Sequence, residues 1–427
     1  MLRRRRDNWR SRHTVLVTDA ETLAGIGVIR ALGRAGYRMV AAADRAGALG
    51  LRSNYANAAH VRPATTHPDF LPWLRRTLEA HAVDVIVPGH AVLVALRPVW
   101  DEFNSRLPFS RERDIVDCGL SKYALFSALR RSGPPATDHL PPLRLLGATD
   151  PAPTSGELAG LGFPVFAKAD AIHGDATAPD RTVPLATPDD VVGQLDEFRR
   201  RYAHMTLQGY APGCGVGAFF LVHEGRVLAE FMHRRLHEVP YTGGVSSLRE
   251  SWRHEGIRAD ALAKLRALEW QGVAMLEYRW DAATDAFALV EMNGRFWGSL
   301  HLALHAGVDF PTSLIDAHLG RPPEARADWP LRVRCRHTFP RELQHVWSMW
   351  KDRGVSLRRK AQTAAACVAL CFDPRMHADL SFPGDRHLFW INLARQVRGA
   401  ANRLRYGRTQ APAPKPELLG PTAQNLA

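Results

Sequence analysis

The sequence predicts an α/β and α+β multidomain protein. The length of the chain, an alternation of strands and helices near its start, and a later change to runs of strands support this prediction. At 427 residues the chain is too long for one ordinary hydrophobic core. We expect a Rossmann-like parallel-sheet domain first, then an α+β unit rich in antiparallel strands, and finally a mostly helical C-terminal region.

The first domain is expected over residues 13–113. Its β-rich segments alternate with helical patterns and lie at residues 14–18, 37–44 and 83–88. This rhythm favours a parallel sheet with helices on both faces. Gly25 and Gly27 follow the first segment as in a dinucleotide fingerprint, but Arg30 stands where a third glycine belongs. A nicotinamide-dependent oxidoreductase is therefore the weaker alternative.

The α+β unit is expected over residues 114–320. Its elements are expected at 121–131 (helix), 165–168 (strand), 188–200 (helix), 205–208, 218–222 and 227–233 (strands), and 259–269 (helix). The remaining segments flank these domains, as a basic disordered leader at 1–12, a basic C-terminal region at 321–408 and a proline-rich disordered tail at 409–427.

The chain is basic, with a formal net charge of +13. Such a balance is compatible with nucleic acid, an anionic membrane surface or anionic substrates. The basic stretches lack the interleaved aromatic residues of a single-strand binding platform, so no nucleic-acid partner is expected. We expect no transmembrane segment and no secretory signal, and therefore a cytoplasmic protein. The longest apolar run, residues 364–372, is expected to pack as a core helix.

Five scattered cysteines suit reduced thiols in a cytosol better than a disulfide framework. Cys367 and Cys371 are four residues apart and could share one face of a helix. No second pair of ligands lies beside them in the sequence, so the pair alone does not predict a zinc site.

Two strands with a turn at 281–285 predict a hairpin, over residues 273–278 and 287–292. Glu277 and Glu291 are fourteen residues apart and their midpoint falls inside the turn, so they should be cross-strand neighbours. Strand periodicity places Asn293 and Arg295 on the same face as Glu291. Opposed carboxylates repel each other unless a cation lies between them, and oxygen ligands of this kind suit Mg²⁺. Arg295 would direct a planar fork toward a phosphoryl oxygen.

Two lysines are candidate phosphate ligands. Lys168 ends an apolar strand, and Lys122 begins a helix, where backbone N–H groups favour anions. Each lysine by itself would more commonly be structural.

The order of these motifs resembles the ATP-grasp superfamily, and most of all the predicted carboxylate–amine ligases related to the carbamoyl phosphate synthetase ATP-grasp domain. The segments that carry the resemblance are Lys122, Phe163–Lys168, Leu207–Gly213, Glu277 and Glu291–Arg295. The resemblance extends over residues 13 to 320. It implies a Rossmann-like domain followed by a two-subdomain ATP-grasp fold, with a lid subdomain at about 143–207.

The resemblance also implies the ligands of ATP and Mg²⁺. The residues that would contact ATP are Lys122 and Lys168 at the phosphates, and Gln208, Gly209 and Tyr210 along the adenine cleft. The residues that would hold Mg²⁺ are Glu277, Glu291 and Asn293. Arg295 would steady the transferred phosphoryl group.

The sequence departs from the family pattern at three places. Ser121 stands where an Asp is usual before the first lysine, and Gly294 replaces a proline. The loop at 170–176 has one glycine and two acidic residues where a glycine-rich phosphate loop is usual. Acidic side chains near a triphosphate are unfavourable unless they face away or bind a cation.

A second polar cluster could serve the acceptor substrate. Arg234 and Arg235 follow His233 at the expected end of a strand, and residues 240–247 form a glycine- and hydroxyl-rich stretch. Adjacent arginines could bind a substrate carboxylate or the γ-phosphate. The alternative is a basic surface loop.

We therefore predict an ATP-dependent ligase that joins a small-molecule carboxylate to an amine through an acylphosphate, with ATP and Mg²⁺. The sequence leaves open whether the protein forms a homodimer. The main alternative is a non-catalytic nucleotide-binding protein, which the acidic loop at 170–176 suggests.

Overall fold

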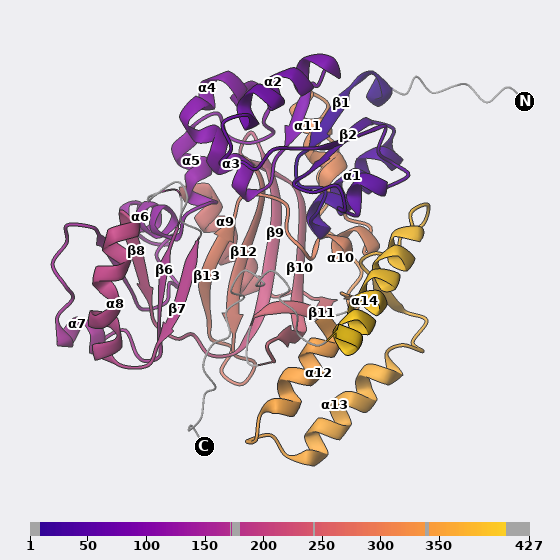
Figure 1. The fold of residues 1–427 in the computed structure, drawn as a ribbon. Coiled ribbons are helices and arrows are strands. Elements are labelled where there is room, and N and C mark those ends of the chain that lie inside the picture. The colour runs from indigo at the N-terminus through magenta and orange to yellow at the C-terminus, as the bar shows by residue number, and fades with distance from the viewer. Residues whose placement is uncertain (1–8, 171, 173–179, 242–243, 338–340, 407–427) are drawn as a thin grey trace, which may run out of the picture.

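The computed structural model describes residues 9–170, 172, 180–241, 244–337 and 341–406 (Figure 1). Most of the predicted leader (residues 1–8), most of the loop at 170–176, and the tail at 409–427 lie outside the described residues. The described strands form three sheets. As predicted, a parallel sheet lies in the N-terminal part and mixed and antiparallel sheets follow.

The N-terminal sheet is parallel and has the strand order β3-β2-β1-β4. Its strands are β1 (Thr14–Val17), β2 (Arg38–Ala43), β3 (Ala58–Val61) and β4 (Val85–Val87). The helices of this part are η1 (Trp9–Arg12), α1 (Leu23–Ala35), η2 (Gly50–Arg52), α2 (Phe70–Ala80), α3 (His90–Leu96), η3 (Arg97–Val99), α4 (Trp100–Phe103), η4 (Asn104–Arg106) and α5 (Arg113–Cys118). Strands β1 and β4 are buried throughout, which agrees with their apolar sequences.

Two details of this part differ from the expectations. Part of the expected leader is ordered, because η1 places Arg10 against the Asp316 carboxylate at 2.9 and 2.5 Å. Gly25 and Gly27 lie inside α1, where a Cβ on Gly25 would meet the Asp19 carbonyl oxygen at 2.1 Å. These glycines serve close packing of a helix and do not form a phosphate-binding turn after β1.

A small antiparallel sheet, here called the lid sheet, has the order β5-β8-β6-β7. Its elements are β5 (Leu143–Gly147), α7 (Ser155–Ala159), β6 (Val165–Ala169), β7 (Arg181–Leu185), α8 (Pro188–Arg201) and β8 (His204–Gln208). The lid sheet and its helices enclose a hydrophobic cluster of their own, separate from the main core. Its strands and helices lie between Leu143 and Gln208.

The large sheet has the order β13-β12-β9-β10-β11-β14-β15. Its strands are β9 (Cys214–His223), β10 (Arg226–Val239), β11 (Val245–Ser251), β12 (Gly272–Trp280), β13 (Phe287–Asn293), β14 (Arg334–Arg336) and β15 (Met376–Ala378). The helices beside it are α6 (Lys122–Ser132), α9 (Glu255–Ala267), α10 (Leu300–His305) and α11 (Phe310–His318). One continuous core joins this sheet to the N-terminal domain.

The C-terminal region contributes the edge strands β14 and β15 and the helices α12 (Arg341–Lys351), α13 (Leu357–Ala369) and α14 (His387–Tyr406) (Figure 1). The expectation that residues 364–372 pack as a core helix is wrong. Helix α13 has no buried residue, and Val368 and Phe372 are 60% and 82% exposed.

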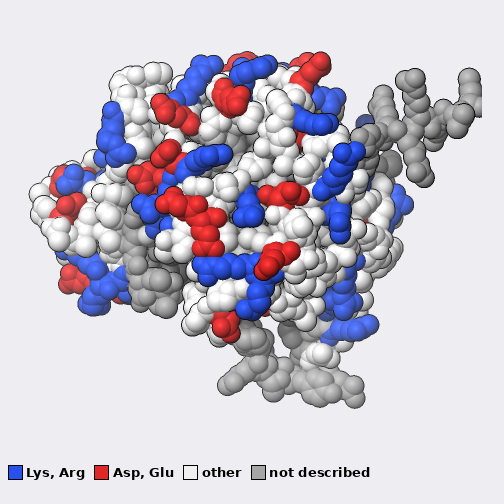
Figure 2. Space-filling view, turned by 90° about the horizontal axis from the view of Figure 1, so that it is seen from above, with Lys and Arg blue, Asp and Glu red and all other residues white. Residues whose placement is uncertain are grey.

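Charges of both signs alternate over the face seen from above the N-terminal domain, as Figure 2 shows. The mixture is clearest at the left and centre of that view, and Lys and Arg predominate along its right side. In the described part of the chain, no helix is both long and apolar enough to cross a membrane.

Candidate active site

The predicted hairpin is present, and Glu277 of β12 is the direct cross-strand partner of Glu291 of β13. A bulge follows this pair, because the register shifts between Glu277 and Tyr278. Asn293 ends β13, and its side-chain amide donates to the Glu291 carboxylate over 3.0 Å. Two carboxylates and one amide oxygen are thus presented together, which confirms the pairing expected from their spacing.

A glycine contact sets the position of the segment after the hairpin. The Gly294 N–H donates to the Gly119 carbonyl over 3.0 Å, and a Cβ on Gly294 would meet the Trp270 ring at 2.4 Å. Proline has no N–H and a larger ring, so it would lose this bond and collide with Trp270. The departure from the family pattern at Gly294 therefore has a local physical cause.

The same contact brings Lys122 to the hairpin, because Lys122 lies three residues after Gly119. The Lys122 ammonium is 3.1 Å from Glu291. Burial alone would lower the pKa of Lys122, but Glu291 and Asp170 raise it above its ordinary value. Lys122 is therefore a permanently charged group beside a candidate metal ligand.

Ser121 and Asp170 cap the helix that Lys122 begins. The Asp170 carboxylate accepts from the Ser121 hydroxyl at 2.8 Å and from the Lys122 N–H at 2.9 Å, while Ser121 accepts from the Ala124 N–H. A carboxylate at a helix N-terminus is stabilised by the helix dipole. Asp170, which appeared unfavourable near a triphosphate, thus has its own partners at the start of α6.

The lid sheet supplies Lys168, which is buried on β6. Its ammonium donates to the Gln208 side-chain oxygen of β8 over 2.5 Å. Burial and the neighbouring charge of Lys122 lower the pKa of Lys168 to about 8. The Gly209 N–H donates to the Pro142 carbonyl, and Tyr210 is half exposed. The three residues expected at the adenine cleft thus continue from a buried strand toward the surface.

Arg235 of β10 contacts Glu277 across β9. Its guanidinium is 2.5 Å from the Glu277 carboxylate and 3.1 Å from Glu238. A Cβ on Gly215 of β9 would meet Arg235 at 2.8 Å, and glycine therefore leaves room for this side chain on the face of the sheet. Burial raises the pKa of Glu277 despite the nearby Arg235. Glu238 was missed in the sequence because its approach depends on the register shifts in β10.

Arg234 lies apart from this group. It pairs with the Glu250 carboxylate at 2.9 Å, which also accepts from Arg334 at 2.7 Å. Successive residues of a strand point to opposite faces, so two adjacent arginines cannot both face Glu277. The strand continues past His233 to Val239, and residues 245–251 form β11 and not a loop. Thr242 and Gly243 lie outside the described residues.

Arg295 follows the hairpin and lies near Glu291. One of its guanidinium N–H groups donates to the Phe296 carbonyl over 3.1 Å. Its Nε is buried and has no hydrogen-bond partner among the described residues. Burial lowers the pKa of Arg295, and Glu291 opposes this shift. A buried unpaired donor of this kind is costly, and an anionic oxygen would satisfy it.

The acidic and basic side chains of the site form ion pairs with one another. Burial would raise the pKa of Glu291, but Lys122 and Lys168 hold it well below its ordinary value. The Glu291 carboxylate therefore remains charged at neutral pH among cationic side chains. Oxygen donors suited to Mg²⁺ lie beside cations suited to phosphate, so the residues present fit both parts of a magnesium nucleotide.

No family model and no curated protein matches the sequence. Solved structures do match the fold. Biotin carboxylase from Campylobacter jejuni, in complex with β,γ-ATP, aligns with a TM-score of 0.55 and 16% identity over 75% of this chain and 74% of that chain.

L-amino acid ligase from Bacillus licheniformis aligns with a TM-score of 0.55 and 14% identity over 73% of this chain and 75% of that chain. N5-carboxyaminoimidazole synthetase from Staphylococcus aureus, complexed with ADP, aligns with a TM-score of 0.56 and 13% identity over 75% of this chain and 80% of that chain. At these identities the likeness concerns the fold. The parallel N-terminal domain, the lid sheet and the large sheet together give this chain an ATP-grasp fold.

Proposed function

We propose that this protein is an ATP-dependent ligase that joins a small-molecule carboxylate to an amine. One observation carries the proposal. The paired carboxylates of Glu277 and Glu291 lie among cations from three elements, namely Lys122, Lys168 and Arg235. A purely structural hairpin does not need oppositely charged side chains from a helix, the lid sheet and a distant strand at one point.

The described residues have distinct roles in the proposal. Glu277, Glu291 and Asn293 would hold Mg²⁺, which when bound neutralises charge on the phosphates. Lys122 and Lys168 would bind phosphate oxygens, and Gln208, Gly209 and Tyr210 would line the adenine. Arg295 would direct its unpaired Nε to the transferred phosphoryl group. Binding of the nucleotide would thus exchange the internal ion pairs of the site for pairs with its phosphates and metal.

The proposed reaction has two steps. A substrate carboxylate oxygen attacks the γ-phosphorus of ATP, so that an acylphosphate forms and ADP leaves. The amine then attacks the acyl carbon, an amide forms, and phosphate leaves with loss of one proton from nitrogen. Arg235 lies on the Glu277 side of the sheet, where it could orient the carboxylate, whereas Arg234 faces Glu250. A cytoplasmic location and a homodimer accompany this proposal.

The second candidate is a nucleotide-binding protein without catalysis. The observation that favours this candidate is that the loop at 170–176 contains only one glycine. Most of this loop lies outside the described residues. The capping role of Asp170 removes part of this argument, because the carboxylate has partners of its own.

Release of ADP and phosphate with pools of candidate acids and amines separates the two candidates. A ligase releases both products only when an acid and an amine are present. Glu291→Gln should abolish the release, and Glu269→Gln, an exposed glutamate outside the site, should not change it. ATP binding without amine-dependent release for every pool would favour the non-catalytic candidate.

A further inference from the structure

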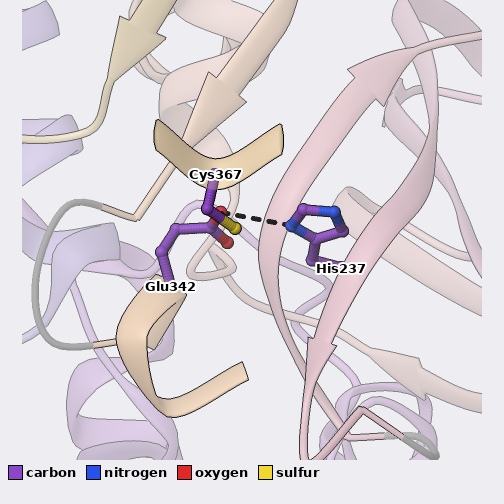
Figure 3. Close-up of side chains that lie close together, drawn as sticks. All are labelled: His237, Glu342 and Cys367. Carbon is purple, nitrogen blue, oxygen red and sulfur yellow. Dashed lines mark hydrogen bonds and ion pairs between the residues drawn. The ribbon is translucent and has the colours of Figure 1, made fainter. Parts of the chain in front are cut away.

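Three metal-ligating side chains meet outside the proposed active site. They are His237 of β10, Glu342 of α12 and Cys367 of α13, and Figure 3 shows them pointing toward one another from these separate elements. One nitrogen, one oxygen and one sulfur atom of the three residues all lie within 4.8 Å of one another. Glu342 is buried, and the other two are partly buried.

The spacings are near those of a shared ion. The His237 Nδ1 lies 3.2 Å from the Glu342 Oε2, and the Cys367 Sγ lies 3.8 Å from the same oxygen. Ligands at about 2.0–2.3 Å on a tetrahedral ion are separated from one another by roughly 3.3–3.7 Å. The two nearer spacings therefore need little movement, and the third needs a modest approach of the thiol to the imidazole.

The backbone of β10 positions His237 for this role. Its register with β11 shifts on both sides of His237, between Arg235 and His237 and again between His237 and Glu238. Bulges of this kind re-aim a side chain relative to the regular alternation of a strand. His237 is thereby directed to α12 and α13, while Arg235, two residues earlier, contacts Glu277.

Helix α13 is weakly attached to the rest of the molecule, and an ion at the cluster would strengthen this attachment. Helix α13 contains no buried residue, so hydrophobic burial fixes it only weakly to the rest of the molecule. The nearby Cys371 is exposed, and its thiol accepts from the Arg336 guanidinium over 3.4 Å. An ion held by β10, α12 and α13 would fasten this helix to the large sheet.

We propose that His237, Glu342 and Cys367 form a Zn²⁺ site that fastens the C-terminal helices to the large sheet. Imidazole, carboxylate and thiolate together suit zinc and not magnesium, which prefers oxygen ligands alone. The fourth position is left to water. Binding replaces the sulfur–hydrogen bond of Cys367 by a sulfur–zinc bond, and the proton leaves to solvent. Without zinc, burial and then Glu342 raise the pKa of Cys367 to about 11, so the free thiol donates to the carboxylate.

Zinc content of the full-length protein tests the proposal. The protein is dialysed with Zn²⁺ in the presence of excess Mg²⁺, which occupies oxygen-only sites, and bound metal is counted. One zinc per chain is expected. Cys367→Ser and His237→Ala should each weaken zinc binding more than about 100-fold, since loss of a direct ligand exceeds the 10- to 100-fold effect of an outer partner. Cys371→Ser, the matched cysteine control, should bind like the wild type.

Two further measurements keep the result independent of folding defects. Substitution with Co²⁺ should give thiolate-to-cobalt absorption in the wild type and in Cys371→Ser, and none in Cys367→Ser. Hydrogen exchange over α13 should slow on addition of zinc. A wild-type protein without stoichiometric zinc, or a folded Cys367→Ser variant that retains it, would overturn the site and leave a hydrogen-bonded cluster.

Discussion

The large sheet and the lid sheet contribute to the candidate site in different ways. The large sheet supplies the carboxylates of Glu277 and Glu291 and shares one core with the N-terminal domain. The lid sheet supplies Lys168 and Gln208 and has a separate hydrophobic cluster. The candidate metal ligands thus belong to the part with the larger core, whereas a candidate phosphate ligand belongs to a small unit with its own core. This division suits a site in which the nucleotide joins two independently packed parts.

The largest effect should follow from a change in the large sheet. Glu291→Gln removes a carboxylate charge that Lys122 and Lys168 stabilise, and it deprives Lys122 of its ion-pair partner. We expect ADP release to fall more than about 100-fold, because loss of a direct metal ligand exceeds the effect of an outer partner. Steady-state kinetics measure this change. Activity within threefold of the wild type would contradict the metal assignment.

The adjacent residues Arg234 and Arg235 of β10 point to opposite faces of the same sheet. Arg235→Met leaves Glu277 without its 2.5 Å partner, and we expect turnover to fall by about 10- to 100-fold. Arg234→Met is the matched control, because Glu250 keeps Arg334 as an ion-pair partner and Arg234 lies apart from the candidate site. We expect it to change turnover less than about threefold. Equal losses in both variants would refute the assignment of only Arg235 to the site.

The glycine contact between the hairpin and α6 can be tested by adding one methyl group. A Cβ in Gly294→Ala would meet the Trp270 ring at 2.4 Å, so the free energy of unfolding should fall by about 1–3 kcal/mol. Gly298→Ala has nothing within 4 Å of its new Cβ and should be nearly neutral. Denaturant unfolding curves compare the two. A neutral Gly294→Ala variant would show that this packing does not set the position of the segment.

The smallest effect should be the pH dependence of ATP affinity that Lys168 of the lid sheet causes. The pKa of Lys168 is lowered to about 8, so its charge is present below pH 8 and is lost as the pH rises through that value. The pKa of Lys122 is raised, so its charge persists. ATP affinity should therefore weaken by about three- to tenfold between pH 7 and pH 9. Calorimetric titration measures this change, and Lys168→Arg should flatten the dependence. An equally steep dependence in the variant would locate the titrating group elsewhere.

Local sequence patterns predicted the parts of the site that depend on one hairpin. The fourteen-residue spacing of Glu277 and Glu291 around a turn was enough to pair them. The apolar residues before Lys168 were likewise enough to predict the strand that carries this lysine. Alternation along β10 could also have separated Arg234 from Arg235, had the strand been extended past His233.

Contacts between distant segments could not be predicted in this way. The approach of Gly294 to Gly119 and the cap that Asp170 places on α6 depend on how separate elements pack. The meeting of His237 with Glu342 is also of this kind, because it joins residues 105 positions apart. None of these contacts leaves a periodic pattern in the sequence, because the partners are close in space but far apart along the chain.

The central claim is that Glu277 and Glu291 hold the magnesium of a magnesium nucleotide. The most direct measurement is the affinity for ATP with and without Mg²⁺, for the wild type and for the double variant Glu277→Gln/Glu291→Gln. The wild type should bind ATP more tightly with Mg²⁺, and the double variant should bind it with the same affinity in both conditions. A folded double variant that keeps the full magnesium dependence would contradict the claim.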